Sequence, residues 1–131
     1  CQARSESFDS ARDSSAVKYA FETLIYHVWA PHTRWNIVFD IPKREIWYRT
    51  AQSPAFKHIS MNSFDFDCKA PRLMLDVNSP LEGDVSEHFI PYNYDVSLNT
   101  LSTFCDRFGI EISREDAEDF TGFFETFKCK P

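Results

Sequence analysis

The sequence predicts an α+β protein in which an antiparallel sheet is covered by helices. Three patterns carry this prediction. Residues 33–50 form two β-rich runs joined by a short polar link that contains a proline, which is typical of a β-hairpin. Residues 17–28 and 117–127 instead repeat their apolar side chains at intervals of about one helical turn. These two segments therefore predict helices that each bury one face.

The composition is that of an ordinary globular chain, and it excludes several classes of function. Of the 131 residues, 43% are hydrophobic and 26% are charged, so a chain of this size can bury a core. The formal net charge of −6 argues against binding to nucleic acid or to an anionic membrane, both of which require basic patches. The longest apolar stretches are too short to span a bilayer. We therefore expect neither nucleic acid nor a membrane as a partner.

The N-terminal part of the chain is expected to contain a polar tail and one helix. Residues 1–13 are polar and aperiodic, which is typical of a loop. The helix begins after Ser14 or Ser15, either of which can cap it, and it ends before Pro31. Its apolar face consists of Val17, Phe21, Leu24, Ile25 and Val28.

The hairpin predicted for residues 33–50 is apolar on both of its faces. In its first strand, Val38 lies on one face, and Trp35, Ile37 and Phe39 lie on the other. A strand with apolar side chains on both faces is usually covered on both faces. We therefore expect the hairpin to be enclosed within a layered structure.

Two further strands are expected at residues 56–61 and 72–77, with a polar loop at 62–70 between them. An Asn-Ser-Pro sequence ends the second of these strands, and an acidic loop follows it. The chain is thus divided into three parts. The tail is followed by a helix with antiparallel strands at residues 14–78, and then by an acidic loop with C-terminal helices at residues 79–131.

The C-terminal part is expected to contain two helices. The apolar spacing over residues 96–108 predicts the first helix, and Gly109 suits the position just after its last residue. Ser113 and Asp116 resemble a capping box at the start of the second. An apolar stripe follows, made of Ala117, Phe120, Phe123, Phe124 and Phe127. We expect this stripe to pack on the chain's own core, and a partner-binding face is the alternative.

The four cysteines, Cys1, Cys68, Cys105 and Cys129, have no C-x-x-C spacing and match no zinc or redox pattern. We interpret them as buried or free thiols. A disulfide between Cys105 and Cys129, which lie on neighbouring predicted helices, is the alternative. The cysteine spacing is compatible with a reducing or an oxidising compartment.

No hydrolase motif is complete in the sequence, because both the G-x-S-x-G and the H-E-x-x-H patterns are absent. The four histidines, His27, His32, His58 and His88, occur singly, and we expect neither a metal ion nor a bound cofactor.

Cys1 is a candidate nucleophile only if it is a mature N-terminus, since its own α-amine would then act as the base. Polar residues rather than a strand follow it, which favours a structural or processing end.

The hairpin resembles that of the linear amide C–N hydrolases, the family of choloylglycine hydrolases and penicillin V acylases. The runs T-R-W-N-I-V-F-D (33–40) and R-E-I-W-Y-R-T (44–50) are similar to the family patterns T-x-W-x-(I/V)-V-(Y/F)-D and (I/L)-(Y/W)-(Y/F)-(R/K)-T. The helix A-V-K-Y-A-F-E-T-L (16–24) resembles the family's A-V-x-x-A-F-x-x-L helix, and the strand at 56–61 takes the place of a family strand. The order agrees over residues 16–78.

This resemblance implies the αββα sandwich of the N-terminal-nucleophile hydrolases, in which two antiparallel sheets are stacked between helical layers. It also implies cleavage of an amide in a bile-salt conjugate, penicillin V or an acyl-homoserine lactone, in the bacterial cytoplasm or periplasm. The family's nucleophile is a mature N-terminal cysteine, and the strand that carries it has no counterpart here. We therefore expect this chain to be an inactive C-terminal structural part that is partnered by the remainder of the hydrolase or by further copies.

One catalytic residue of the family has a candidate in this chain. The family carries an arginine in an S-x-x-R-F-like segment upstream of the helix, and the run from Cys1 to Arg4 puts Arg4 at that position. Ser5 follows it where the family has an aromatic residue, so an exposed arginine in the tail is the alternative. A second hypothesis for the whole chain is a self-standing α+β binding or interaction module without catalysis.

Overall fold

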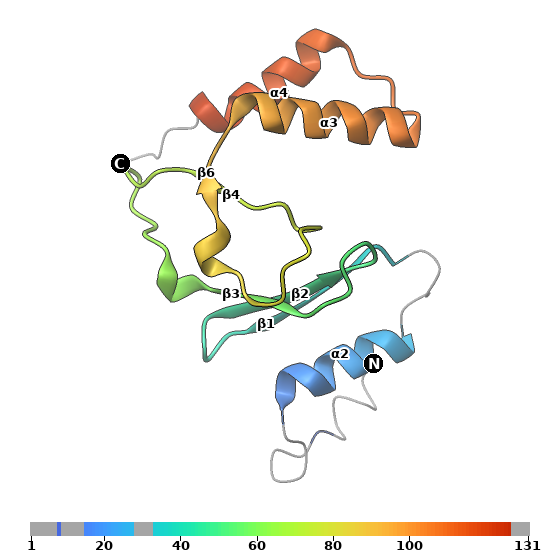
Figure 1. The fold of residues 1–131 in the computed structure, drawn as a ribbon, viewed down its shortest axis with the longest axis vertical. Coiled ribbons are helices and arrows are strands. Elements are labelled where there is room, and N and C mark those ends of the chain that lie inside the picture. The colour runs from blue at the N-terminus through green and yellow to red at the C-terminus, as the bar shows by residue number, and fades with distance from the viewer. Residues whose placement is uncertain (1–7, 9–14, 28–32, 127–131) are drawn as a thin grey trace. The chain divides into compact units, whose positions relative to one another are not determined.

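The computed structural model describes residues 8, 15–27 and 33–126, and it has the predicted α+β class (Figure 1). Its helices are α2 (Ala16–His27), α3 (Tyr94–Phe108) and α4 (Arg114–Thr126), with the 3-10 helices η1 (Met61–Ser63) and η2 (Ser86–His88). Its strands are β1 (Trp35–Asp40), β2 (Glu45–Thr50), β3 (Lys57–Ser60), β4 (Leu73–Met74), β5 (Gly83–Asp84) and β6 (Ile90–Pro91). The chain forms two compact units. Unit 1 comprises Cys1–Asp65 and Leu75–Phe89, and unit 2 comprises Phe66–Met74 and Ile90–Pro131.

Unit 1 is built on a sheet of four strands in the order β1-β2-β3-β5. The predicted hairpin is confirmed, because β1 and β2 pair antiparallel from Trp35 with Thr50 to Asp40 with Glu45. In the turn between them, the carboxylate of Asp40 accepts a hydrogen bond from the backbone N–H of Lys43. Strand β3 pairs antiparallel with β2, which confirms the predicted third strand.

The fourth strand, β5, lies in the segment for which the sequence predicts an acidic loop. It runs parallel to β3 over only two residues. The backbone N–H groups of Gly83 and Val85 donate to the carbonyl groups of Phe56 and His58. Gly83 has a φ of 73°, a left-handed conformation that glycine adopts without strain. Because this strand is short and has no apolar alternation, nothing local in the sequence predicts it.

One face of the sheet is covered by α2, which begins where the sequence predicts. The hydroxyl of Ser15 accepts a hydrogen bond from the backbone N–H of Lys18 and so caps the helix. Phe21 is buried, and its ring meets the ring of Phe56 edge-on at 4.9 Å between centroids. The guanidinium of Arg49 lies 5.4 Å from the centre of the same Phe56 ring. Figure 1 shows α2 lying beside the hairpin.

The opposite face of the sheet is covered at β2 and β3 but only partly at β1, where Ile37 is half-buried. Tyr48, Thr50 and Lys57 are buried on this face, under the loop that precedes β5. Trp35 and Phe39 belong to the same face by register, yet they are 62% and 61% exposed. The expectation that both faces of the hairpin are covered is therefore wrong at β1, because the covering loop reaches only the inner strands.

Unit 2 pairs α3 with α4 and adds the two-stranded sheet of β4 and β6. Both predicted helices and their predicted end signals are confirmed. Gly109 follows α3 with a φ of 64°, as a left-handed C-terminal residue should. The hydroxyl of Ser113 accepts from the backbone N–H of Asp116 and donates to its carboxylate. At the start of α3, Asn93 accepts a hydrogen bond from the backbone N–H of Val96.

The strand expected at residues 72–77 is present but shorter than predicted. Only Leu73 and Met74 form a strand, β4, and it pairs with β6 rather than with the four-stranded sheet. The carboxylate of Asp76 accepts a hydrogen bond from the backbone N–H of Asn78 and thereby forms a turn. This local bond competes with a continued strand, so the pairing ends early.

Helix α4 buries its small residues rather than its phenylalanines. Ala117 and Thr121 are buried. The exposed phenylalanines are Phe120, Phe123 and Phe124, at 59%, 56% and 46%. The expectation that the apolar stripe packs on the chain's own core is therefore confirmed for Ala117 and wrong for these three, because the short side chains of Ala117 and Thr121 allow a close helix approach that the longer phenylalanine side chains beside them do not fit. Phe127 lies outside the described residues.

The cysteines divide into two kinds. Cys105 is a buried free thiol, as expected, which excludes a disulfide between it and Cys129. Cys68 is disulfide-bonded, so the interpretation as a free thiol is wrong for this residue. Cys1 and Cys129 lie outside the described residues.

Candidate functional site

The residues that the sequence nominates for catalysis cannot be placed in a site. Cys1 and Arg4 lie outside the described residues, so their roles stay predictions. Within the described ranges, no group of three or more His, Cys, Asp or Glu side chains could hold a metal ion. None of the helices in that part of the chain combines the length and the apolar character that crossing a bilayer requires.

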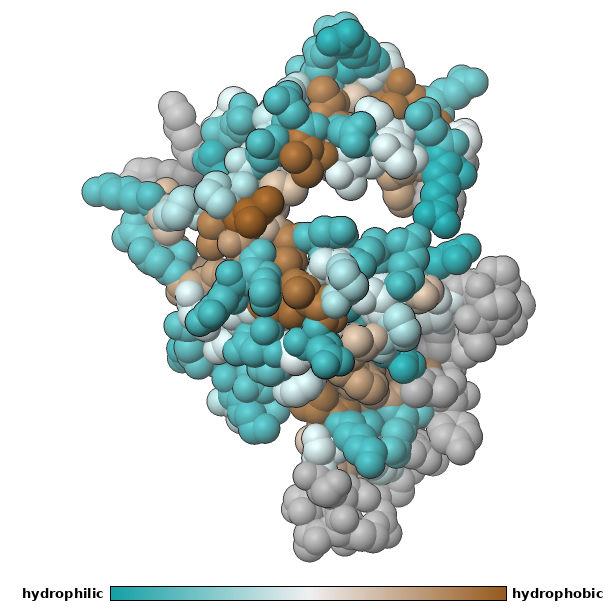
Figure 2. Space-filling model, in the orientation of Figure 1, coloured by the Kyte–Doolittle hydropathy of each residue, from teal (hydrophilic) through white to brown (hydrophobic). Residues whose placement is uncertain are grey.

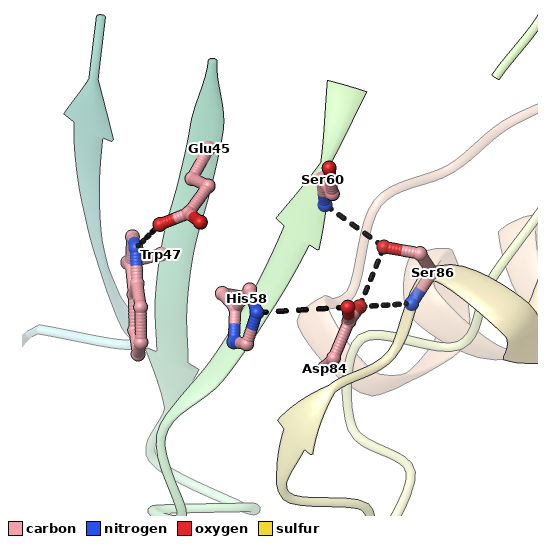
Figure 3. Close-up of polar contacts among 6 residues, drawn as sticks. All are labelled: Glu45, Trp47, His58, Ser60, Asp84 and Ser86. Atoms are coloured by element: carbon pink, nitrogen blue, oxygen red, sulfur yellow. Dashed lines mark hydrogen bonds and ion pairs between the residues drawn. The ribbon is translucent and has the colours of Figure 1, made fainter. Parts of the chain in front are cut away.

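A polar cluster nevertheless lies on one face of the sheet in unit 1, where β2, β3 and β5 are neighbours (Figure 3). We call it the His58 cluster, and it consists of Glu45, Trp47, His58, Ser60, Asp84 and Ser86. The strand register brings its members together, because His58 is the pairing partner of both Trp47 on β2 and Asp84 on β5. The imidazole stacks on the indole at 4.4 Å between ring centroids and 20° between planes.

Asp84 is the electrostatic centre of the His58 cluster. One of its carboxylate oxygens, Oδ2, lies 3.7 Å from Nε2 of His58. The other, Oδ1, accepts hydrogen bonds from the hydroxyl and the backbone N–H of Ser86, at 2.6 and 2.9 Å. The pKa of Asp84 is lowered, chiefly by the Ser86 hydroxyl, then by the Ser86 backbone N–H, with a smaller contribution from His58. Asp84 is therefore a carboxylate at neutral pH.

The cluster contains a serine, a histidine and an aspartate, but their order does not make a catalytic triad. In a triad the serine hydroxyl donates to the histidine, which in turn donates to the aspartate. Here the hydroxyl of Ser86 donates to Asp84 and accepts from the backbone N–H of Ser60 at 2.8 Å. Ser86 is also buried. The arrangement therefore holds β5 and η2 against β3 instead of activating a nucleophile.

The remaining members of the cluster fix the orientation of its rings. The indole N–H of Trp47 donates to the carboxylate of Glu45 at 2.9 Å, and this bond fixes the plane on which the imidazole stacks. Nδ1 of His58 is buried and has no hydrogen-bond partner among the described residues. The imidazole is thus held on both sides, by the indole plane and by Asp84.

A second polar cluster lies on the other face of the sheet, around a fully buried lysine. Lys57 has 0% exposure, and its ammonium donates to the hydroxyl of Ser53 at 2.7 Å and to its carbonyl at 3.3 Å. The same ammonium lies 5.5 Å from the centre of the Tyr48 ring. The pKa of Tyr48 is raised, first by burial and then by the negative charge of Asp76.

This lysine cluster also fastens a loop rather than performing chemistry. The hydroxyl of Ser53 donates to the carbonyl of Ser79 at 2.9 Å, and the hydroxyl of Thr50 donates to the amide oxygen of Asn78 at 2.8 Å. A Ser–Lys catalytic pair would need the lysine to accept the serine proton. In this geometry Lys57 donates, and the serine proton goes to a carbonyl. Both side chains are also buried away from any substrate.

Sequence reasoning missed both clusters, although one signal for each was visible. His58 alternates with Lys57 in the predicted third strand, which puts them on opposite faces of the sheet. Asp84, the charged partner of His58, lies far away in the sequence, in the acidic loop, whereas Ser53, the partner of Lys57, lies only four residues away but outside the predicted strands. Because one sequence does not give the register between strands, it does not show which of these residues lie side by side.

No protein-family model matches this chain, and neither does any curated protein or any solved structure. The function must therefore be inferred from the described geometry together with the sequence resemblance of the hairpin.

Proposed function

We propose that the chain is the C-terminal structural part of a hydrolase that cleaves linear amide C–N bonds, and that it supports the active site without supplying catalytic groups. Bile-salt conjugates, penicillin V and acyl-homoserine lactones are the substrate classes that the resemblance implies. The remainder of the hydrolase is the partner. The observation that carries the proposal is the uncovered outer strand of the sheet.

Strand β1 ends the four-stranded sheet, and no described strand pairs with its outer side. It also carries large apolar side chains that the described residues leave exposed, namely Trp35 and Phe39, and Ile41 follows it at 75% exposure. Unpaired, apolar edge strands are normally avoided in free proteins because they associate with other chains. In an αββα sandwich, the remainder of the hydrolase would cover this edge.

The two polar clusters support the same proposal. They fasten the loop before β5 and the segment after it to the inner strands and to Ser53 through partly buried hydrogen bonds. A sheet held in this way is a rigid support, which suits a layer behind an active site. The serine hydroxyls of the two clusters, on Ser86 and Ser53, are buried and donate to a carboxylate and to a backbone carbonyl, which fits a part that performs no chemistry by itself.

The disulfide of Cys68 favours the periplasm over the cytoplasm as the location of the hydrolase, because structural disulfides persist in oxidising compartments. Mass spectrometry of the non-reduced chain, isolated from the periplasm of a bacterial host, tests this. A Cys68 peptide joined to another cysteine peptide is expected, and a freely alkylated Cys68 would contradict it.

The main experiment measures turnover of penicillin V and glycocholate by the purified chain, alone and after co-expression with the nucleophile-bearing N-terminal segment of a choloylglycine hydrolase. No turnover is expected from the chain alone, and turnover is expected from the co-purified complex. The double variant Trp35→Thr with Phe39→Thr should abolish co-purification, and Val77→Thr, an exposed apolar control outside β1, should not. Turnover by the chain alone would sink the proposal.

The alternative is a self-standing α+β binding module. It predicts a monomer that melts cooperatively and does not bind the dye ANS at β1. If the chain is instead the structural part proposed here, the wild-type chain should bind ANS. The ANS fluorescence should then be lower in the double variant of Trp35 and Phe39 but unchanged in Val77→Thr. Equal dye binding by the wild-type chain and the double variant favours the alternative.

A further inference from the structure

Strand β1 is the outer strand of the four-stranded sheet, and the direction of its backbone hydrogen-bonding groups can be assigned. The carbonyl of Arg34 accepts a hydrogen bond from the backbone N–H of Ala51, so the backbone groups of residue 34 face β2. In an antiparallel pair every second residue faces the partner strand. The backbone groups of Trp35, Ile37 and Phe39 therefore point away from β2, and the described residues contain no strand on that side.

The residues with outward backbone groups also carry large apolar side chains. Trp35 and Phe39 are exposed, and Ile37 between them is half-buried. Figure 2 shows apolar side chains, in brown, among hydrophilic ones over the strands of unit 1. A further strand at this edge would gain backbone hydrogen bonds and apolar contacts at the same three residues.

A second copy of β1 fits this edge in the antiparallel direction. Residues with outward backbone groups must lie across from one another, so the possible registers differ by two residues. When Ile37 lies across from Ile37 of the second copy, Trp35 lies across from Phe39 of that copy. The backbone groups and the aromatic side chains then match in the same register, and cross-strand aromatic pairs stabilise a sheet.

The charges at the two ends of β1 favour this register over its neighbours. In the register centred on Ile37, the exposed Arg34 lies across from Asp40 of the second copy. The two neighbouring registers put Arg34 across from Val38 or Pro42, and neither of these carries a charge. Asp40 also pairs with a lysine of its own turn at 3.5 Å, so the arginine would add a second cation to that carboxylate.

We propose that two copies of the chain pair antiparallel through β1, with Ile37 of each copy at the two-fold axis, and so join their four-stranded sheets into one. Pairing of this kind covers both open edges at once, and the assembly closes at two copies. In this register Asn36 lies across from Val38, and its amide oxygen already accepts a hydrogen bond from Arg49 at 3.3 Å. A six-residue strand is a small interface, so the dimer should dissociate on dilution.

The inference goes beyond the proposed amide hydrolase, because it concerns the chain in the absence of the hydrolase remainder, which would compete for the same edge. Sedimentation equilibrium of the whole chain between about 1 and 100 μM should show a reversible equilibrium between monomer and dimer. Arg34→Glu puts two carboxylates across from each other at both ends of the paired strands and should raise the Kd of the dimer about 5-fold.

Arg107→Glu is the matched control, because it makes the same change in net charge at an exposed position of α3 in unit 2. It should leave the Kd of the dimer unchanged. Equal effects of the two charge reversals would mean that β1 is not the interface, and that outcome would overturn the proposal. Circular dichroism verifies that both variants keep the fold.

Cysteine cross-linking tests the register itself. In the proposed pairing, the two Cα atoms of residue 37 lie about 5.5 Å apart, within the range that a disulfide spans. The oxidant copper phenanthroline removes one electron and one proton from each thiol, so Ile37→Cys should form a covalent dimer on a non-reducing gel, beyond the level in the oxidised wild-type chain. In Phe39→Cys the two residues lie about 13 Å apart along the strands, and no such dimer is expected. Equal cross-linking of the two variants would overturn the register.

The outcome of the dimer experiment can be separated from that of the hydrolase experiment. A chain that stays monomeric at all concentrations, yet co-purifies with the nucleophile-bearing segment, overturns the dimer and leaves the amide hydrolase standing. A dimer that shows the expected cross-link but does not co-purify with that segment supports the pairing and removes the hydrolase proposal. A dimer that neither responds to Arg34→Glu nor cross-links through Ile37→Cys uses another surface and overturns the pairing through β1.

Discussion

The two units of the molecule differ in the size of the side chains that they bury: among the described residues, unit 1 buries Phe21, Tyr48 and Lys57, and the buried side chains of unit 2 are small. In unit 1, the ammonium of Lys57 and the hydroxyls of Thr50 and Ser53 are enclosed beneath a loop. In unit 2, large aromatic side chains such as Phe120 remain exposed, and the buried positions of α4 hold small residues. Burial in this chain thus depends on what lies across from a position more than on the apolar character of its side chain.

The physical cause of this difference is whether a side chain has hydrogen-bonding or packing partners at its position. A buried ammonium is costly unless hydrogen bonds satisfy it, and Ser53 provides two acceptors for Lys57. That requirement fixes the loop in one position on the sheet. An exposed phenylalanine incurs no such cost within the unit, but it leaves apolar area that a partner can cover. The buried polar groups therefore specify the fold, and the exposed apolar groups offer a surface for binding.

Replacing the buried lysine should produce the largest loss of stability. Lys57→Ala leaves a cavity and removes the donor that joins Ser53 to the sheet, so the free energy of unfolding should fall by about 3 kcal/mol. Urea denaturation measures this loss. Lys43→Ala is the matched control, because its ammonium is exposed and pairs only with Asp40 at the surface. A change within about 0.5 kcal/mol is expected there. Equal losses in the two variants would remove the basis of the comparison.

Enlarging a buried small residue of α4 should have the next largest effect. Ala117→Leu puts a larger side chain where α4 packs on α3 and pushes the two helices apart, so it should lower the free energy of unfolding by about 2 kcal/mol. Phe123→Ala removes far more apolar volume, yet it should cost less than about 0.5 kcal/mol because the ring is mostly exposed. Thermal melting of both variants measures the two losses of stability. A larger cost for Phe123→Ala would show that the phenylalanine stripe is core after all.

Removing the hydroxyl that caps α4 should lower the free energy of unfolding by a smaller amount. Ser113→Ala deletes the hydroxyl that accepts from the backbone N–H of Asp116, so the chain should lose about 1 kcal/mol of stability. Ser102→Ala is the control, because the hydroxyl of Ser102 only bonds back to the carbonyl of Leu98 within α3. Alanine suits a helix interior, so that variant should be neutral or slightly stabilising. Similar losses in both variants would contradict the capping role of Ser113.

The features that could be predicted from the sequence are those encoded by neighbouring residues. The cap of α4 needs only Ser113 and a partner three residues later, and the hairpin needs only two runs and a turn. The left-handed Gly109 after α3 belongs to the same class. These signals act over less than about twenty residues, so one sequence is sufficient to find them.

The features that could not be predicted depend on distant partners. Strand β5 exists because its backbone reaches β3, and the strand expected after residue 72 is short because Asp76 turns the chain. The His58 cluster joins three strands, and no sequence pattern near His58 predicts that Asp84 lies beside it. The side of α4 that faces inward follows from how closely two helices pack, which depends on both helices. For the nominated catalytic residues, Cys1 and Arg4, the expectations stay predictions.

Acidification should produce the smallest effect, and it tests the His58 cluster alone. The pKa of Asp84 is lowered in the folded chain from its ordinary value of 3.8, so its hydrogen bonds stabilise the fold above that pH. This contribution is lost as the pH falls below about 4 and through the lower pKa of the folded state. The side chain is 54% exposed, and solvent screening therefore limits the effect to roughly 0.5 kcal/mol.

The experiment compares urea midpoints of the wild-type chain and Asp84→Asn between about pH 2 and pH 6. The wild-type chain should lose more stability on acidification than the variant does, because the variant has no carboxylate to protonate at this position. Ser86→Ala should also flatten the pH response, since the Ser86 hydroxyl is the main cause of the lowered pKa. Parallel pH curves for all three proteins would mean that these bonds do not stabilise the charged carboxylate. The His58 cluster would then be held together by packing alone, and the polar character of unit 1 would not explain how its loops are fixed.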